Sequence, residues 1–323
     1  MNDTLERYRQ ASRYKSDFHM HTLPLGITFL ERGWLSSNNV LIQDEHQAIL
    51  VDTGYWTHAN QTEQLVRGLL NNRVLDMIIN THLHSDHCGG NAHLQQSYSE
   101  VRTLIPAGQV AFVDSWNAEA LTYTPTGQYC PPFSRTDILN NGDGFQINGA
   151  FWRVITAPGH DPHSIVLFNE QERILISADA LWENGFGVVF PEIEGNNAFD
   201  EVQSTLQIIE QLKPSIVLPG HGSSFKDVSS ALARARSRLK QFKNSPEKHA
   251  AYAAKVLLKF KLLELQKTTL HTFYSWALNC SYLKLLQKEY APQITFKNWF
   301  ELQCISLAKS SACKIEDNCI INV

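Results

Sequence analysis

The sequence predicts an α/β fold followed by a smaller helical region, and three observations carry this prediction. Over the first two thirds of the chain, short runs of Val, Ile and Leu alternate with segments whose apolar residues recur at helical spacing. From residue 226 onward the pattern is helical. The charge changes at the same point: residues 1–225 hold 12 Lys and Arg against 25 Asp and Glu, whereas residues 226–323 hold 16 against 7. We therefore predict two domains, 1–225 and 226–323.

Strands and helices alternate in the first region, as expected where helices cover a sheet. The expected strands are residues 39–42, 48–51, 77–80, 152–156, 165–168, 174–177 and 216–218. The expected helices are residues 59–70, 107–115 and 199–212. Residues 121–137 and 182–197 are rich in Gly, Pro and aromatic residues, and they predict either walls of a functional pocket or irregular surface connections.

The second region predicts several helices followed by a hairpin. Ser245, Pro246 and Glu247 form a helix start, with a capping residue and Pro in the first turn. Further helices are expected at residues 248–265, 269–278, 282–290 and 296–308, and a hairpin in residues 313–323 turns at 316–318. This order indicates a winged-helix-like module.

Composition narrows the class of protein. No run of 18 apolar residues is present, so a membrane span is not expected. The first twenty residues carry charges throughout and lack an apolar core, which predicts a cytoplasmic protein. The cysteines show no CxxC spacing, so we expect free thiols. They are Cys88, Cys130, Cys280, Cys304, Cys313 and Cys319.

The strongest motif is the segment THLHSDHCGG at residues 81–90. It places His82, His84, Asp86 and His87 within six residues. Imidazole and carboxylate are good ligands for zinc and neighbouring metals. A continuous helix would spread these side chains around its axis, whereas a loop after the strand at 77–80 can turn them toward one point. We interpret Cys88 as not being a ligand.

Other candidate ligands follow later strands. His160 comes after the strand at 152–156, Asp179 after 174–177 and His221 after 216–218. Strand ends on one side of a sheet can gather a site from distant parts of the sequence. Asp52 also ends a strand, where it could orient a metal-binding imidazole through its second nitrogen. We interpret the remaining histidines His58, His93, His249 and His271 as surface or helix-packing residues, and His19 and His21 as having no metal role.

These motifs resemble the metallo-β-lactamase superfamily, which carries HxHxDH followed by His, Asp and His at successive strand ends. The resemblance covers roughly residues 27–225. It implies a four-layer αβ/βα sandwich with metals at one edge. By position it implies a first metal at His82, His84 and His160, a second at Asp86, His87 and His221, a bridging Asp179, and Asp52 behind the ligands.

Asp179 indicates which branches of the superfamily this chain resembles. Class B β-lactamases typically have Cys at this position, whereas the glyoxalase II, lactonase and nuclease branches have Asp. Residues 159–164 read GHDPHS where glyoxalase II-like proteins often read GHTPGS, so His163 is a minor rival to His160. His84 stands where the di-iron oxygen-reducing branch usually has Glu. The resemblance therefore favours two Zn²⁺ ions, with iron or manganese left open.

The expected reaction is hydrolysis of a small ester, thioester or lactone by a hydroxide between two metals. Beside its ligand role, Asp86 could accept a proton or steer the hydroxide. Trp182, Phe186 and Phe190 could form an apolar substrate pocket, with Phe29 and Trp34 as weaker candidates, or could pack under a loop. One alternative is a phosphodiesterase or endoribonuclease on the same metals. Another is a metal-bound regulatory protein with incidental hydrolysis. The alternative RNA contacts are Arg234, Arg236, Arg238, Lys240 and Lys243.

Overall fold

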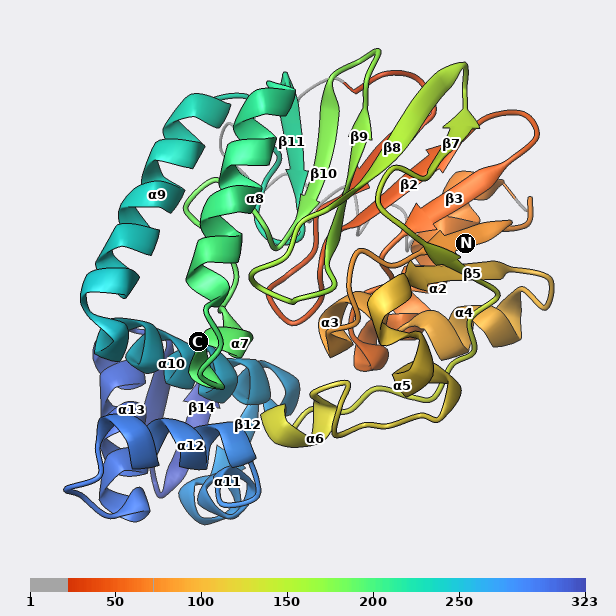
Figure 1. The fold of residues 1–323 in the computed structure, drawn as a ribbon. Coiled ribbons are helices and arrows are strands. Elements are labelled where there is room, and N and C mark those ends of the chain that lie inside the picture. The colour runs from red at the N-terminus through yellow and green to blue at the C-terminus, as the bar shows by residue number, and fades with distance from the viewer. Residues whose placement is uncertain (1–22, 72) are drawn as a thin grey trace.

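The computed structural model describes residues 23–71 and 73–323, and two mixed sheets lie at its centre (Figure 1). The first has the strand order β1-β2-β3-β4-β5-β6, and the second has β11-β10-β9-β8-β7. Their bounds are β1 Ile27–Leu30, β2 Asn39–Gln43, β3 Ala48–Val51, β4 Met77–Ile79, β5 Arg102–Pro106, β6 Asp137–Leu139, β7 Gly144–Ile147, β8 Ala150–Thr156, β9 Ile165–Asn169, β10 Ile174–Ala178 and β11 Ile216–Pro219. His19 and His21, for which no metal role is expected, lie outside the described residues.

The two sheets pack face to face because their strands bury side chains on both surfaces. In β2, Val40 and Ile42 join the core between the sheets, while Leu41 points to the outer face. In β10, Ile176 faces the same inner core and Leu175 faces outward. This alternation follows the two-residue period of a strand. Both faces are therefore apolar, and each sheet needs a covering layer.

Helices supply these outer layers. On the first sheet lie α2 (Ala59–Leu70) and α4 (Asn91–Ser97), and on the second lie α8 (Ala198–Leu212) and α9 (Val228–Asn244) (Figure 1). In α8, Val202, Leu206 and Ile209 recur at helical spacing and are buried against the sheet. The αβ/βα sandwich that the sequence predicts is confirmed.

The C-terminal helices form a cluster with its own apolar core, below the sandwich in Figure 1. A three-stranded sheet, in the order β12-β14-β13, accompanies them. The bounds are α10 Pro246–Leu265, β12 Lys267–Thr269, α11 Leu270–Ala277, α12 Ser281–Tyr290, α13 Phe296–Lys309, β13 Cys313–Glu316 and β14 Cys319–Asn322. Helix α9 still packs on the sandwich, so the core of this cluster is built from α10 onward together with Val188, Phe190 and Ile193. The domain division at residue 225 and the winged-helix interpretation stay predictions.

Three segments differ from the expected pattern. The helix expected at 107–115 divides into a 3-10 turn, Ala107–Gln109, and a short α5, Val110–Asp114. The two irregular segments each contain one helical turn, α6 (Tyr123–Thr126) and α7 (Phe190–Ile193). None of the helices in the described part of the chain combines the length and apolar character that a membrane span requires. All six cysteines are free thiols, as expected.

Candidate metal centre

The topology brings the predicted donors to one edge. Strands β8 and β10 each pair antiparallel with β9, and β10 pairs parallel with β11, so the ends of β8, β10 and β11 meet on one side. His160, Asp179 and His221 follow these three ends. From the facing sheet, the parallel strands β3 and β4 end beside them.

The motif at 81–90 is a loop that leads into a single helical turn. His82 and His84 lie in the loop after β4, and Asp86 and His87 lie on α3 (Ser85–Cys88). The turn is closed by the backbone N–H of Cys88, which donates to the carbonyl of His84 at 3.1 Å. Together, the loop and the helical turn direct these four side chains toward the strand ends. Cys88 points away, toward Tyr123 and Cys130.

The donor atoms converge. Those of His82, His84 and His160 lie within 4.8 Å of one another and could hold a metal ion. So could two adjoining groups, which are His82, His87 and Asp179, and Asp86, His87 and His221.

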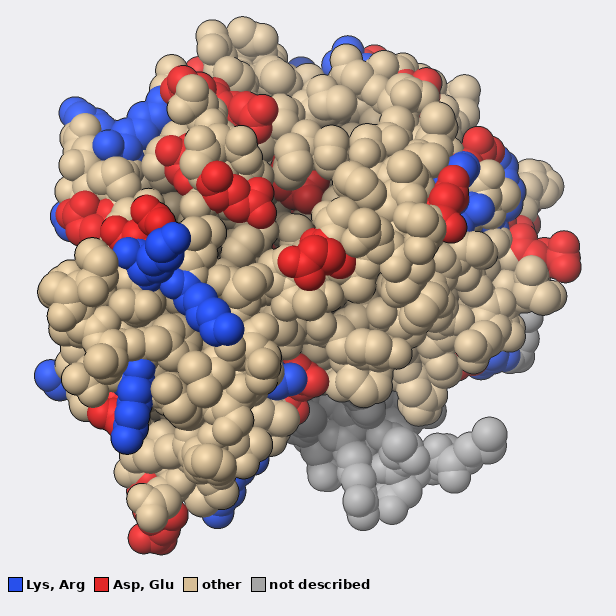
Figure 2. Space-filling view, turned by 60° about the horizontal axis from the view of Figure 1, so that its bottom comes forward, with Lys and Arg blue, Asp and Glu red and all other residues tan. Residues whose placement is uncertain are grey.

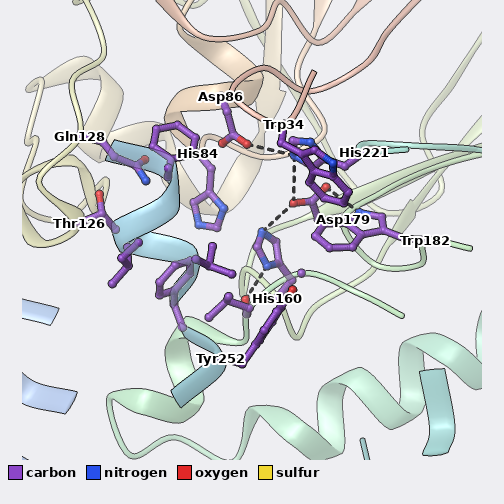
Figure 3. A pocket seen from close by; sticks show the side chains of 16 residues that line it. Trp34, His84, Asp86, Thr126, Gln128, His160, Asp179, Trp182, His221 and Tyr252 are labelled. Atoms are coloured by element: carbon purple, nitrogen blue, oxygen red, sulfur yellow. Dashed lines mark hydrogen bonds and ion pairs between the residues drawn. The ribbon is translucent and has the colours of Figure 1, made fainter. Parts of the chain in front are cut away.

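Asp179 lies between the outer groups. Its Oδ2 lies 3.4 Å from Nε2 of His160 and 3.8 Å from Nε2 of His221, while its Oδ1 lies 3.4 Å from Nε2 of His87. At the far side, Nε2 of His221 lies 3.1 Å from Oδ2 of Asp86. Figure 3 shows Asp179 between the rings of His160 and His221.

Two buried nitrogens show that this donor set fits a metal. Nε2 of His87 and Nε2 of His160 are inaccessible to solvent and have no hydrogen-bond partner. Such orphaned atoms are rare in proteins, and each needs an explanation. In both rings the other nitrogen already has a hydrogen-bond partner. Nδ1 of His87 bonds to the carboxylate of Asp52 at 2.7 Å, and Nδ1 of His160 bonds to the carbonyl of Val188 at 2.5 Å. A ring held at one nitrogen with the other left bare is the arrangement of a metal-binding histidine.

Asp52 stands behind the donors. Its carboxylate accepts hydrogen bonds from the Thr81 backbone N–H at 2.9 Å, the Thr81 hydroxyl at 2.7 Å and Nδ1 of His87. The backbone at Asp52 has φ of +57°, a conformation that costs a non-glycine residue free energy and is often kept at functional sites. Asp52 therefore orients His87 and ties it to the loop at Thr81.

The surroundings of His82 and His84 favour the neutral form of both imidazoles. Burial lowers the pKa of His82 well below its usual value, and burial together with His160 lowers the pKa of His84 to about 4. Both rings are thus neutral near pH 7 and have lone pairs to offer. For His87, burial opposes the charged form, but Asp179 and Asp52 outweigh it and hold the pKa well above its usual value.

Two glycines allow the close approach of the donor loops. A Cβ on Gly220 would collide with Oδ1 of Asp179, and a Cβ on Gly187 would collide with the ring of His160. A side chain at either position would therefore displace a donor. The rival His163 lies elsewhere, since its ring packs over Gly108 and it lines no part of the site.

A pocket opens over the donors (Figure 3). Trp182 and Phe190 line it, and the Nε1–H of Trp182 donates to Asp179 at 3.1 Å. Trp34 also lines it and stacks on His221 with ring centroids 5.3 Å apart. The expectation for Phe186 is corrected, because its ring is buried in the core of the sandwich against Phe242 and does not reach the pocket.

The rest of the pocket wall comes from two other segments. Phe29, a weaker candidate, packs on the core between the sheets instead. Thr126 and Gln128 belong to residues 121–137, for which a pocket wall was one of two expectations. The lining residues of α10 were not expected from the sequence, because none of them has a metal-binding side chain. They are Tyr252, Val256, Leu257 and Phe260.

A buried histidine on α10 makes the stability of the metal-free protein depend on pH. Burial lowers the pKa of His249 to about 4, below the 6.5 of an exposed histidine. The unfolded chain therefore binds more protons between these values, and stability falls as pH drops from 6.5 toward 4. We expect His249 to account for about 3 kcal/mol of this loss. Urea unfolding at pH 7 and pH 4.5 should show a smaller loss for His249→Phe, and equal losses would contradict the assignment.

A four-layer sandwich with grouped His and Asp donors at one edge defines a class of metal-binding enzymes, and comparison with known proteins agrees. Residues 32–221 match the family described as the Metallo-beta-lactamase superfamily. The chain belongs to this superfamily.

Several relatives by sequence carry hydrolase names. Acyl-coenzyme A thioesterase MBLAC2 of Gallus gallus is 26% identical over 161 residues, which is 46% of this chain and 57% of that protein. Its Homo sapiens counterpart is 22% identical over 62% of this chain and 79% of that protein. Hydroxyacylglutathione hydrolase of Edwardsiella ictaluri (strain 93-146) is 26% identical over 52% of this chain and 56% of that protein. The chain thus spans little more than half of two of these three relatives.

Solved structures share the fold. A metallo-beta-lactamase of Cronobacter sakazakii with a mutated HARLDQ motif has a TM-score of 0.57 at 17% identity, over 71% of this chain and 98% of that one. A metallo-beta-lactamase family protein of Thermus thermophilus has a TM-score of 0.54 at 18% identity, over 94% of this chain and all of that one. At such identities the likeness concerns the fold alone.

Proposed function

We propose that the protein is a dinuclear metal hydrolase, with zinc as the favoured metal, that cleaves a small ester, thioester or lactone. The observation that carries the proposal is the set of three adjoining donor groups in which two buried imidazole nitrogens have no partner. The apolar pocket above them and the thioesterase and hydroxyacylglutathione hydrolase names of the relatives support a small acyl substrate.

The donors would divide between two ions. His82, His84 and His160 would hold one, and Asp86, His87 and His221 the other, with Asp179 lying between the two groups. Such a pair would supply a water of lowered pKa and would polarise a carbonyl oxygen.

Side chains of the protein supply the other parts of the proposed mechanism, which are proton acceptance and positioning of the donors. His87 and His221 oppose the effect of burial and hold the pKa of Asp86 below its usual value, so this carboxylate is ionised at neutral pH. It lines the pocket and can accept a proton from the attacking water. Trp182 holds Asp179 through its indole N–H, and Trp34 covers His221. These two rings also keep bulk water from one side of the donors.

The structure weakens the RNA-cleaving alternative. Arg236 forms a paired contact with Glu210 at 2.7 and 2.8 Å, and Lys243 binds Asp200 at 2.7 Å. Arg238 lies over the ring of Tyr252 at 5.5 Å. On the face drawn in Figure 2, where the described residues are coloured, Lys and Arg lie beside Asp and Glu and form no continuous basic area. Two of the five expected RNA contacts, Arg236 and Lys243, thus pair with acidic residues of the same chain, and Arg238 covers an aromatic ring.

A panel of substrates tests the proposal. Metal-loaded protein is offered thioesters, esters, lactones, a bis-aryl phosphodiester and RNA, and kcat/KM is measured before and after chelation. We expect at least tenfold higher kcat/KM for the best acyl substrate than for either phosphodiester, loss of activity with the chelator, and recovery when metal is added. A preference for RNA, or no turnover by protein that retains its metal, would favour one of the two alternatives.

A further inference from the structure

The pocket over the donors adjoins an apolar groove along α10. Trp34, Tyr252, Val256 and Phe260 line both spaces, so the two spaces lie side by side. The pocket offers about 110 Å³ of room and the groove about 480 Å³. The pocket alone is therefore too small for more than the reacting end of a substrate, and the groove is the larger part of the accessible volume.

The groove has the form of a channel for a linear chain. Tyr252, Val256, Phe260 and Leu263 recur at helical spacing on one face of α10. With a rise of 1.5 Å per residue, this face is about 16 Å long, roughly the length of an extended chain of ten to twelve carbon atoms. The buried Leu307 of α13 forms part of the opposite wall.

Two lysines, Lys255 and Lys259, line the groove, and we assign neither of them to phosphate binding. The ammonium group of Lys259 donates to the carbonyls of Ala312 and Val323 and to the side chain of Asn322, at 2.6, 3.0 and 2.7 Å. It therefore fastens the end of β14 to α10 and has no capacity left for an anion. The stem of Lys255 adds apolar surface beside Val256, as long charged side chains often do at a surface.

We propose that this groove binds a linear acyl chain whose ester or thioester carbonyl lies at the donors. This proposal rests on the proposed function and specifies its substrate class. The leaving group then lies toward Thr126 and Gln128, which Figure 3 shows on the side of the pocket away from Trp34 and Trp182. A straight chain fits because the groove is long, apolar and open at one end, where Val323 is 58% exposed.

The test varies the acyl chain and keeps the leaving group constant. N-acetylcysteamine thioesters with butanoyl, octanoyl and dodecanoyl chains are compared in wild type, Leu263→Glu and Leu265→Glu. Leu263 lines the far part of the groove, whereas Leu265 is an exposed residue of the same helix outside it. We expect kcat/KM to rise at least tenfold from butanoyl to dodecanoyl in wild type. Leu263→Glu should lower the dodecanoyl value about tenfold and leave the butanoyl value unchanged, and Leu265→Glu should change neither.

A profile that is flat in wild type, or one that Leu263→Glu lowers equally for all chains, overturns the proposal. If metal-loaded wild type cleaves neither these thioesters nor any ester or lactone of the panel, the proposed function fails and calorimetry with dodecanoate decides the groove separately. Binding that Leu263→Glu weakens and Leu265→Glu preserves would support the groove, and no binding by wild type would reject it.

A second inference rests on a different observation, a hydrogen-bond chain behind His160. Nδ1 of His160 donates to the carbonyl of Val188 at 2.5 Å, and the N–H of Val189 donates to Nε2 of His249 at 3.1 Å. This carbonyl and N–H belong to one peptide group. His249 is 2% exposed and packs between Phe199 and Phe242, with ring centroids 5.1 and 4.9 Å away. Its nitrogen is therefore held in place as an acceptor.

We infer that His249 is a positioning residue for the donor His160. Acceptance at the N–H end polarises the peptide group, so its carbonyl accepts more strongly from His160. A stronger acceptor at Nδ1 fixes the ring and raises the basicity of its free Nε2, which is the effect that partners behind a metal-binding histidine have. Through this chain α10, which follows the sandwich in sequence, also takes part in the metal centre.

The zinc affinity of two variants tests this inference. His249→Phe keeps an aromatic ring but removes the acceptor, whereas His249→Gln keeps an acceptor. We expect about tenfold weaker zinc binding for the Phe variant in chelator competition. The Gln variant should stay within threefold of wild type, although both variants lose the imidazole. Wild-type affinity in the Phe variant, or equal weakening in both, overturns the inference. His160→Ala is the reference, because unchanged zinc binding there would reject the metal assignment itself.

Discussion

Asp179→Ala is expected to reduce the kcat of hydrolysis about a thousandfold, which corresponds to about 4 kcal/mol at 1.36 kcal/mol per tenfold. The reason is the position of the carboxylate, which lies 3.4 Å from the free nitrogens of both His87 and His160. Without it the two donor groups lose their shared anion. The burial of Asp179 is otherwise unfavourable for its charge, yet His221 and His87 hold its pKa well below the usual value.

Steady-state kinetics on the best acyl substrate of the panel measures this effect. Asp179→Asn separates charge from shape, because it keeps the size of the side chain and the contact with Trp182, and we expect it to lose nearly as much activity as Ala. Asp137→Ala is the control, since this carboxylate pairs with Arg102 at the surface. An Asp179→Ala variant that folds and retains activity within threefold of wild type would refute the role.

Asp52→Asn is expected to weaken metal binding roughly 10- to 100-fold, the usual effect of removing a partner behind a ligand. The amide can keep the contact with the Thr81 backbone N–H, but it presents an N–H group where His87 and the Thr81 hydroxyl now donate. His87 then loses its orientation directly, whereas His82 is affected only through the Thr81 hydroxyl, which lies 3.1 Å from its Nδ1. Chelator competition should therefore resolve one strongly weakened site and one less affected site. Equal affinity of both sites in the variant and wild type would contradict the role of Asp52.

The strands that position the site could be predicted, whereas several others could not. The seven expected strands all form, because most are runs of Val, Ile and Leu buried on both faces, and β8 alternates buried Trp152 and Val154 with more exposed residues. Strands β1, β6 and β7 were missed, and all three lie at sheet edges, where a strand buries fewer apolar residues. The missed β5 is an inner strand, but it begins with an Arg and ends with a Pro, which obscure its pattern.

The donors could be predicted because His and Asp at successive strand ends are a rare combination of residue type and place. The residues of the pocket wall could not be predicted in this way. Tyr252 and Val256 lie on a helix whose periodicity shows that it is amphipathic but not which part of it meets the metal centre. Phe186 shows the opposite error, since in a loop rich in aromatics the sequence does not tell which ring turns inward.

Metal stoichiometry tests the central claim most directly. Wild-type protein saturated with zinc and freed of excess should contain two zinc ions per chain by elemental analysis. The double variant His87→Ala/His221→Ala should contain one, because the group of His82, His84 and His160 remains. Wild-type protein that holds no stoichiometric metal, or a double variant that still holds two ions, would contradict the account.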